Sequence, residues 1–207
     1  MCHRLTLVIS ALLLSGLAFA QPVPPPPRGD APPRPADATP AAIDGTVKQF
    51  LLAPRGEVEG LLLNDGTQVA VPPHLRDALS STVRAGDAVH VDGRRESATR
   101  VAAAAIADRS NGKSVVDAGP PASPPPPPDV AEPVAMSAKG AITVLLTGRR
   151  GEVNGAVLDD GSILRFAPRR AAYDAAKFAV GQRLAVSGMG EQNQFGRVID
   201  VQSLQAE

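Results

Sequence analysis

The chain carries one sequence pattern twice, and this internal repeat constrains its fold more than any other feature. Residues 45–93 align without gaps with residues 140–188, at an offset of about 95 residues, and about 14 of roughly 49 aligned pairs are identical. The identical pairs include turn residues: Arg55-Gly56-Glu57-Val58 matches Arg150-Gly151-Glu152-Val153, and Asp65-Gly66 matches Asp160-Gly161. The repeat therefore predicts two domains with the same order of strands and turns.

Each copy predicts five strands and one short helix. In the first copy, residues 46–53, 57–63 and 67–71 are rich in strand-forming residues and are separated by glycine-containing turns. Pro73 then begins a helix, Gly86 ends it, and two further strands follow, around residues 89–91 and over 100–107. The second copy repeats this order, with Pro168 as the helix start and a loop two residues longer before its last strand, residues 197–204.

This order, β-β-β-α-β-β in about 65 residues, is that of the OB-fold, a small five-stranded barrel. The segments GEVEGLLLNDG (56–66) and GDAVHVDG (86–93), with their second-copy counterparts, resemble OB-type domains of uncharacterised exported bacterial proteins. The resemblance covers both copies and implies a mainly β protein with two tandem OB-like barrels. It brings no functional residues with it, so function has to be inferred from the sites.

The N-terminus has the layout of a secretory signal peptide. Arg4 precedes an apolar run over residues 5–19, and Ala18-Phe19-Ala20 is a typical peptidase site. Because this run is shorter than the roughly 20 residues of a membrane-spanning helix, we expect cleavage after Ala20, a periplasmic or secreted protein and no transmembrane segment afterwards. An uncleaved anchor is the alternative. Cys2 would leave with the signal, and no disulfide or thiolate site would remain.

Two proline-rich stretches divide the rest of the chain. We expect a signal peptide at 1–20, a disordered linker at 21–42, an OB-like domain at 43–109, a second linker at 110–138 and a second OB-like domain at 139–207. Five consecutive prolines at 124–128 indicate a semi-rigid spacer, with a ligand for a proline-binding domain as the alternative. Such a spacer favours independent domains, although modules this small would also gain stability by packing together.

The sequence offers no catalytic, metal or cofactor site. The histidines at 74 and 90 lack partners at ligand spacing, the serines lack a nucleophile elbow, and the acids lie in tight turns where they bind backbone amides. We therefore expect a protein that is not an enzyme and binds no cofactor.

The candidate ligand-binding residues are charged. Arg55 and Glu57 lie in the first hairpin of the first copy, and Arg150 and Glu152 are their counterparts in the second. The second copy adds arginines that could form one basic surface, in its hairpin, third strand and helix start: Arg149, Arg165, Arg169 and Arg170. A solvated surface without a ligand is the alternative for all of them.

The function expected from these features is that of a non-enzymatic envelope protein that binds an unknown protein or an anionic envelope ligand. Nucleic-acid binding is a disfavoured alternative, because the net charge is zero and the chain has few aromatic residues on which bases could stack. A structural spacer or assembly protein is a further alternative.

Overall fold

The structure, a computed structural model, describes residues 39–121, 132–167 and 178–206. These residues belong to one compact unit, Asp37–Glu207. The expected signal peptide, most of the first linker, the five consecutive prolines and the helix start at Pro168 lie outside the described residues. No helix in the described part of the chain is long and apolar enough to cross a membrane.

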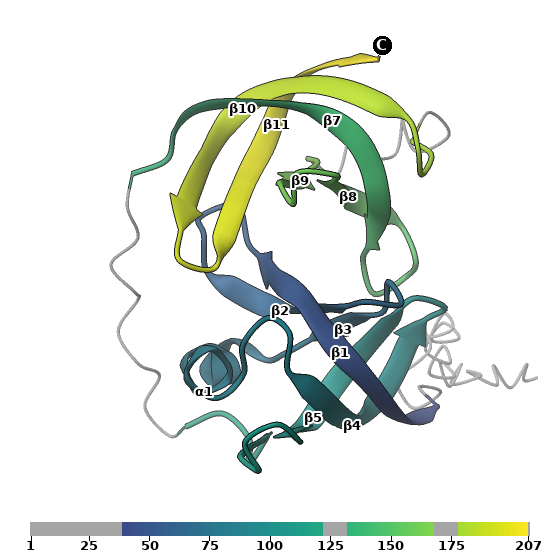
Figure 1. Cartoon of the computed structure of the whole chain (residues 1–207), viewed down its shortest axis with the longest axis vertical. Helices are drawn as coiled ribbons and strands as arrows, with labels where there is room; N and C mark the ends of the chain where they lie inside the picture. Colours follow the sequence, from purple (N-terminus) through teal and green to yellow (C-terminus); the bar gives the residue numbers. More distant parts are fainter. Residues whose placement is uncertain (1–38, 122–131, 168–177, 207) are drawn as a thin grey trace, which may run out of the picture. The chain divides into compact units, whose positions relative to one another are not determined.

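Eleven strands and one short helical segment make up the described elements (Figure 1). The first copy contains β1 (Pro40–Leu52), β2 (Val58–Leu63), β3 (Gln68–Ala70), a 3₁₀ turn (Pro73–Leu75) that continues into α1 (Arg76–Thr82), β4 (Ala88–Ser97), β5 (Arg100–Asp108) and β6 (Ser114–Val116). The second copy contains β7 (Val134–Thr147), β8 (Val153–Leu158), β9 (Ile163–Arg165), β10 (Arg183–Asn193) and β11 (Gly196–Ala206).

Both copies close into five-stranded barrels, which confirms the predicted fold class. In barrel 1, β1 pairs with β2 and β4, β5 pairs with β4, and the parallel pairing of β3 with β5 closes the sheet. In barrel 2, β7 pairs with β8 and β10, and the parallel pairing of β9 with β11 closes the sheet in the same way. The predicted strand order is therefore observed in both copies.

Turn glycines place the hairpins in the same positions of both barrels. Gly56 and Gly66 have φ values of 84° and 87°, and their counterparts Gly151 and Gly161 have φ values of 80° and 82°. Residues with a Cβ atom rarely adopt these conformations, so the repeated glycines mark positions where the backbone requires them. This is the physical reason that the repeat predicted the hairpins of both copies.

Three strands extend beyond the predicted domain boundaries. The strand β6 and the first residues of β7 lie inside the 110–138 range expected to be linker, and β1 begins at Pro40. The short β6 pairs with β5 through Val115 opposite Ile106, and Val115 is buried. A three-residue strand with one buried side chain gives too weak a sequence pattern to be recognised.

The two barrels pack against each other, which corrects the expectation of independent domains. One hydrophobic cluster contains core residues of barrel 1 such as Leu52 and Leu61 together with Leu146, Val157, Ile163 and Val198 of barrel 2. A second cluster, built around the stacked rings of Phe166 and Phe178, belongs to barrel 2 alone. We call the contact region between the barrels the seam.

Candidate functional site

An aromatic pair lies at the seam. The rings of Phe50, on β1, and Phe195, in the β10–β11 hairpin, meet edge to face with their centroids 5.2 Å apart. Phe50 is buried, and Phe195 is partly buried against the cluster that both barrels share. Edge-to-face pairs add to the free energy gained from apolar burial, so the hairpin of barrel 2 is anchored on barrel 1.

A buried glutamine reaches across the seam from barrel 1. Gln68, on β3, is only 1% exposed. Its Oε1 atom accepts a hydrogen bond from the backbone amide of Thr147 at 3.0 Å, and its Nε2 atom donates to the carbonyl oxygen of Leu145 at 3.2 Å. A buried amide side chain must satisfy both groups to avoid a desolvation cost. Here backbone groups of barrel 2 form hydrogen bonds with both the oxygen and the nitrogen of the Gln68 amide.

Arg165 reaches across the seam in the other direction. Its Nε atom donates to the carbonyl oxygen of Leu52 at 2.8 Å, and its Nη2 atom forms an ion pair with Glu59 of barrel 1. The Arg165 side chain is 11% exposed. Burial lowers the pKa of Arg165 and the nearby Glu59 carboxylate opposes that shift, but an arginine remains protonated in proteins. Arg165 thus belongs to the seam, which corrects its expected place on an exposed basic surface.

The contacts across the seam are reciprocal. Leu52 and Thr147 occupy equivalent positions in the repeat, and each carbonyl oxygen accepts a hydrogen bond from an arginine of the opposite barrel. Arg165 donates to Leu52, and Arg100 donates to Thr147 through Nη1 at 3.2 Å. The acceptor positions are thus equivalent in the two copies, whereas the donors are not, because Arg165 is on β9 and Arg100 is on β5.

The hairpin tips follow the same reciprocal arrangement. In barrel 1 the β4–β5 hairpin residue Glu96 pairs with Arg149, in the β7–β8 loop, at 3.3 Å. In barrel 2 the β10–β11 hairpin residue Asn193 donates through Nδ2 to the carbonyl oxygen of Gly56, in the β1–β2 loop, at 3.0 Å. The loops between strands one and two and between strands four and five border the usual ligand face of OB barrels. Here both pairs of loops contact the opposite barrel.

Those of the predicted charged residues that the structure describes lie in different surroundings. Arg55 and Arg150 are exposed at the tips of their loops, and the Arg149 side chain is 83% exposed while pairing with Glu96. Glu57 is half-buried, and the Glu152 carboxylate accepts a hydrogen bond from the backbone amide of Arg150 at 3.0 Å. Arg169 and Arg170 lie outside the described residues. The described arginines of the predicted set thus divide between exposed loop tips and the buried seam.

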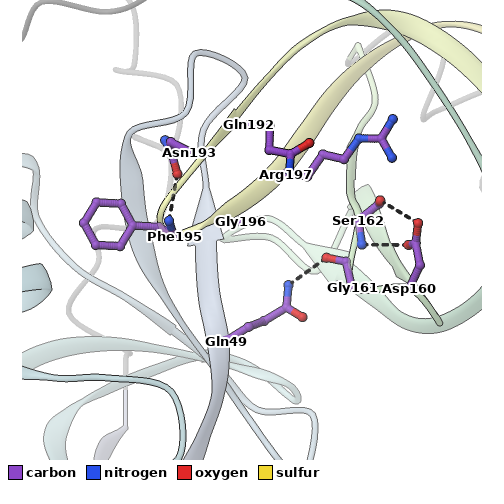
Figure 2. A pocket seen from close by; sticks show the side chains of 9 residues that line it. All are labelled: Gln49, Asp160, Gly161, Ser162, Gln192, Asn193, Phe195, Gly196 and Arg197. Atoms are coloured by element: carbon purple, nitrogen blue, oxygen red, sulfur yellow. Dashed lines mark hydrogen bonds between the residues drawn. The ribbon is translucent and has the colours of Figure 1, made fainter.

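A polar cleft opens beside the seam and is the candidate site (Figure 2). It has a volume of about 410 Å³ and combines Gln49 of barrel 1 with two hairpins of barrel 2. Its lining residues are Gln49, Asp160, Gly161, Ser162, Gln192, Asn193, Phe195, Gly196 and Arg197. In Figure 2 the Gln49 side chain points toward Gly161, whose carbonyl oxygen accepts a hydrogen bond from Nε2 at 3.2 Å.

Two of the lining groups are held by local turns. The Asp160 carboxylate accepts hydrogen bonds from the amide and the hydroxyl of Ser162 at 2.8 and 2.9 Å. Asn193 accepts a hydrogen bond from the amide of Phe195 at 2.9 Å through Oδ1. The cleft wall is therefore preorganised, whereas the side chain of Gln192 is exposed.

The cleft residues were not among the sequence-based candidates. Gln192 to Arg197 lie at the β10–β11 hairpin, where the second copy is two residues longer than the first. That extra length was the available signal, because insertions relative to a repeat map to loops that often carry binding residues. Gln49 could not have been found, since the cleft includes it only through the packing of the two barrels.

The described part of the chain contains no group of three or more His, Cys, Asp or Glu residues placed to hold a metal ion. Its two histidines each pair with an aspartate. His74 lies 2.8 Å from Asp117, and His90 on β4 lies 2.8 Å from Asp44 on β1. The His90 hydrogen bond lowers the pKa of Asp44, and the amide of Gly119, followed by His74, lowers the pKa of Asp117. These pairs connect neighbouring segments of barrel 1.

Comparison with known proteins gives neither a family nor a curated relative, because no family model and no curated protein matches the sequence. Solved structures that match include the wild-type single-stranded DNA binding protein from Thermus aquaticus and a deletion mutant of it. Each is 13% identical to this chain, with a TM-score of 0.26; the matches cover 81% of this chain and 92% and 93% of the respective chains. The assignment of two OB-type barrels rests on the strand pairing described above.

Proposed function

We propose that this protein is a non-enzymatic binding protein of the cell envelope, which holds a polar segment of a partner protein in the cleft beside the seam. The observation that carries this proposal is the composition of the cleft: side-chain amides, a carboxylate, a hydroxyl and a guanidinium gathered from both barrels. Side-chain amides both donate and accept hydrogen bonds and so match the groups of an extended peptide. The envelope location is supported by the N-terminal sequence, in which Arg4 precedes an apolar run over residues 5–19.

The hydrogen bonding of the cleft residues supports binding more than catalysis. Ser162 is the lining hydroxyl, and it donates to Asp160 within its own turn. Nucleophilic catalysis needs a base aimed at the nucleophile and an orienting group behind that base. Asp160 instead accepts from both the amide and the hydroxyl of Ser162, as an aspartate does in a tight turn.

Substitution of Gln192 tests this proposal. Its side chain is exposed at the cleft, so Gln192→Trp should obstruct the cleft and leave the fold intact. Gln205→Trp, at an exposed position of β11 that does not line the cleft, is the matched control. Capture of a partner from envelope extract by the wild type and by Gln205→Trp, with loss in Gln192→Trp, supports the proposal. Equal capture by all three proteins would exclude the cleft as the site.

Nucleic-acid binding is the second candidate, and the observation that favours it is the exposure of Arg55, Arg149 and Arg150 on the hairpin loops of two OB-type barrels. The described aromatic residues argue against nucleic-acid binding. Phe50, Phe166 and Phe178 are buried, and Phe195 packs against Phe50, so these rings do not form the stacking platform that proteins use to hold single strands.

Fluorescence anisotropy with a labelled oligothymidine separates the two candidates. If the arginines bind nucleic acid, affinity should fall steeply with salt concentration. It should fall further in the Arg55→Ala, Arg149→Ala, Arg150→Ala triple variant. Our leading proposal predicts no saturable binding at physiological salt in either protein.

A further inference from the structure

We propose that the seam can also form between two copies of this protein, with barrel 1 of one chain packed against barrel 2 of another in an exchanged dimer. The partner is therefore a second copy of the same chain, and the surface is the one that joins the barrels within a chain. This inference concerns the seam and holds whatever ligand the cleft takes.

The first argument is that the sheet of each barrel closes without strands of the other barrel. Among the described strands, all pairings lie within one barrel, and in each the parallel pairing of the third strand with the fifth closes the sheet. None of these strands adds to the sheet of the opposite barrel. The described contacts between the barrels are therefore of the kind that two subunits can make without sharing a sheet.

The second argument is the reciprocity of the contacts. Arg165 and Arg100 bind equivalent carbonyl oxygens on opposite barrels, and Glu96 and Asn193, from equivalent hairpins, contact equivalent loops. Both barrels thus use equivalent acceptor positions and equivalent loops, as the two sides of a homodimer interface do, although the donor residues differ between the copies. Separate chains can satisfy all of these groups in the same way.

The third argument concerns the connection. Residues 117–133 join the barrels and contain the five consecutive prolines at 124–128. A seam within one chain is favoured over a seam between chains only by the effective concentration that this connection provides. The exchanged dimer therefore becomes more populated as protein concentration approaches that value.

Exchange would also change which chains supply the residues of the cleft. Gln49 comes from barrel 1, and Asp160 and Gln192 come from barrel 2. An exchanged dimer has two seams and thus two clefts, each lined by residues of both chains. A partner protein bound in one cleft would then contact two copies of this protein at once.

Charge exchange between chains tests the proposal. The Arg165→Glu variant and the Glu59→Arg variant each place like charges at the seam, so neither forms a stable seam within its own chain. When the two variants are mixed, both seams of an exchanged heterodimer have opposite charges. One seam joins the two substituted side chains, and the other joins the two native ones. The single variants should therefore be monomers, and their mixture should form a species of twice the mass.

The experiment is refolding from urea of each variant alone and of the equimolar mixture, followed by light scattering behind size-exclusion chromatography. A chain carrying both substitutions is the control, because it restores opposite charges within one chain and should be a folded monomer. A mixture that stays monomeric while this control folds would overturn the proposal. If the control does not fold, Glu96→Lys and Arg149→Glu, a pair whose arginine side chain is 83% exposed, are used with the same criterion.

Discussion

The Nε atom of Arg165 lies 2.8 Å from the carbonyl oxygen of Leu52, so a side chain of barrel 2 completes the hydrogen bonding of strand β1 in barrel 1. The same guanidinium pairs with Glu59, whose side chain is 39% exposed. Replacement by Arg165→Met leaves the Leu52 carbonyl and the Glu59 carboxylate without this partner. Removing one member of a buried pair costs several kcal/mol, and the exposure of Glu59 reduces that cost.

We therefore expect Arg165→Met to lower the free energy of unfolding by about 2 kcal/mol, measured by urea denaturation followed by circular dichroism. Arg183→Met, at an exposed position of β10, is the control and should change the free energy by less than about 0.5 kcal/mol. Equal effects of the two substitutions would show that Arg165 makes no stabilising contact.

Gln68→Ile gives a second test of the seam. Isoleucine is the residue that the second copy has at the equivalent position, so its size and strand propensity suit the site. The substitution nevertheless leaves the amide of Thr147 and the carbonyl of Leu145 without their partner. We expect a loss of about 1–3 kcal/mol in the free energy of unfolding. Gln49→Ile is the control, because it removes only one hydrogen bond at a half-buried position. If Gln49→Ile lowered the free energy of unfolding as much as Gln68→Ile does, this account would be contradicted.

The equivalent glycines of the two copies give a matched comparison. Gly56 and Gly151 both have positive φ values, so alanine at either position costs about 1 kcal/mol from backbone strain. A Cβ atom on Gly56 would also lie 2.6–2.8 Å from the Glu191 carboxyl group across the seam, whereas a Cβ atom on Gly151 meets no atom of the described residues within 4 Å. The Glu191 carboxyl group is the far end of a flexible side chain and can move aside, so Gly56→Ala should destabilise the protein by only slightly more than Gly151→Ala in thermal unfolding. A larger cost at Gly151 than at Gly56 would contradict this account.

Acid should weaken the contact between β6 and the start of the helical segment. The Gly119 amide and the His74 ring, each 2.8 Å from Asp117, hold the pKa of this carboxyl below its usual 3.8. Because the pKa is lowered in the folded state, the stabilisation is complete above the unfolded-state pKa and is lost as the pH falls through the folded-state pKa. The difference in urea midpoint between wild type and Asp117→Asn should thus shrink from about pH 5 to about pH 2. A difference that stays constant over this range would contradict the assignment.

The barrels were predictable from the sequence because their signals are local. Turn glycines such as Gly66 and Gly161 and the alternation of buried residues such as Val89 and Val91 recur in both copies. The seam was not predictable because its polar residues differ between the copies. Gln68 aligns with Ile163 of the second copy, and Arg165 aligns with Ala70 of the first copy. The repeat therefore indicates no shared role for either position. An arginine on a short strand is usually solvated, and only the packing of the barrels buries this one.

The cleft could be predicted from the sequence only in part, for the same reason. Its hairpin could be suspected from the longer loop of the second copy, but Gln49 joins the site only across the seam. Sequence reasoning within one module cannot place two residues side by side when the contact between the modules brings them together.

The most direct test of the packed seam is a double-mutant cycle on Phe50 and Phe195, whose ring centroids lie 5.2 Å apart. The free energy of unfolding is measured by urea denaturation for the wild type, Phe50→Leu, Phe195→Leu and the double variant. If the rings meet as described, the two losses should deviate from additivity by about 0.5–1.5 kcal/mol. Losses that add within about 0.3 kcal/mol would contradict a seam between the barrels.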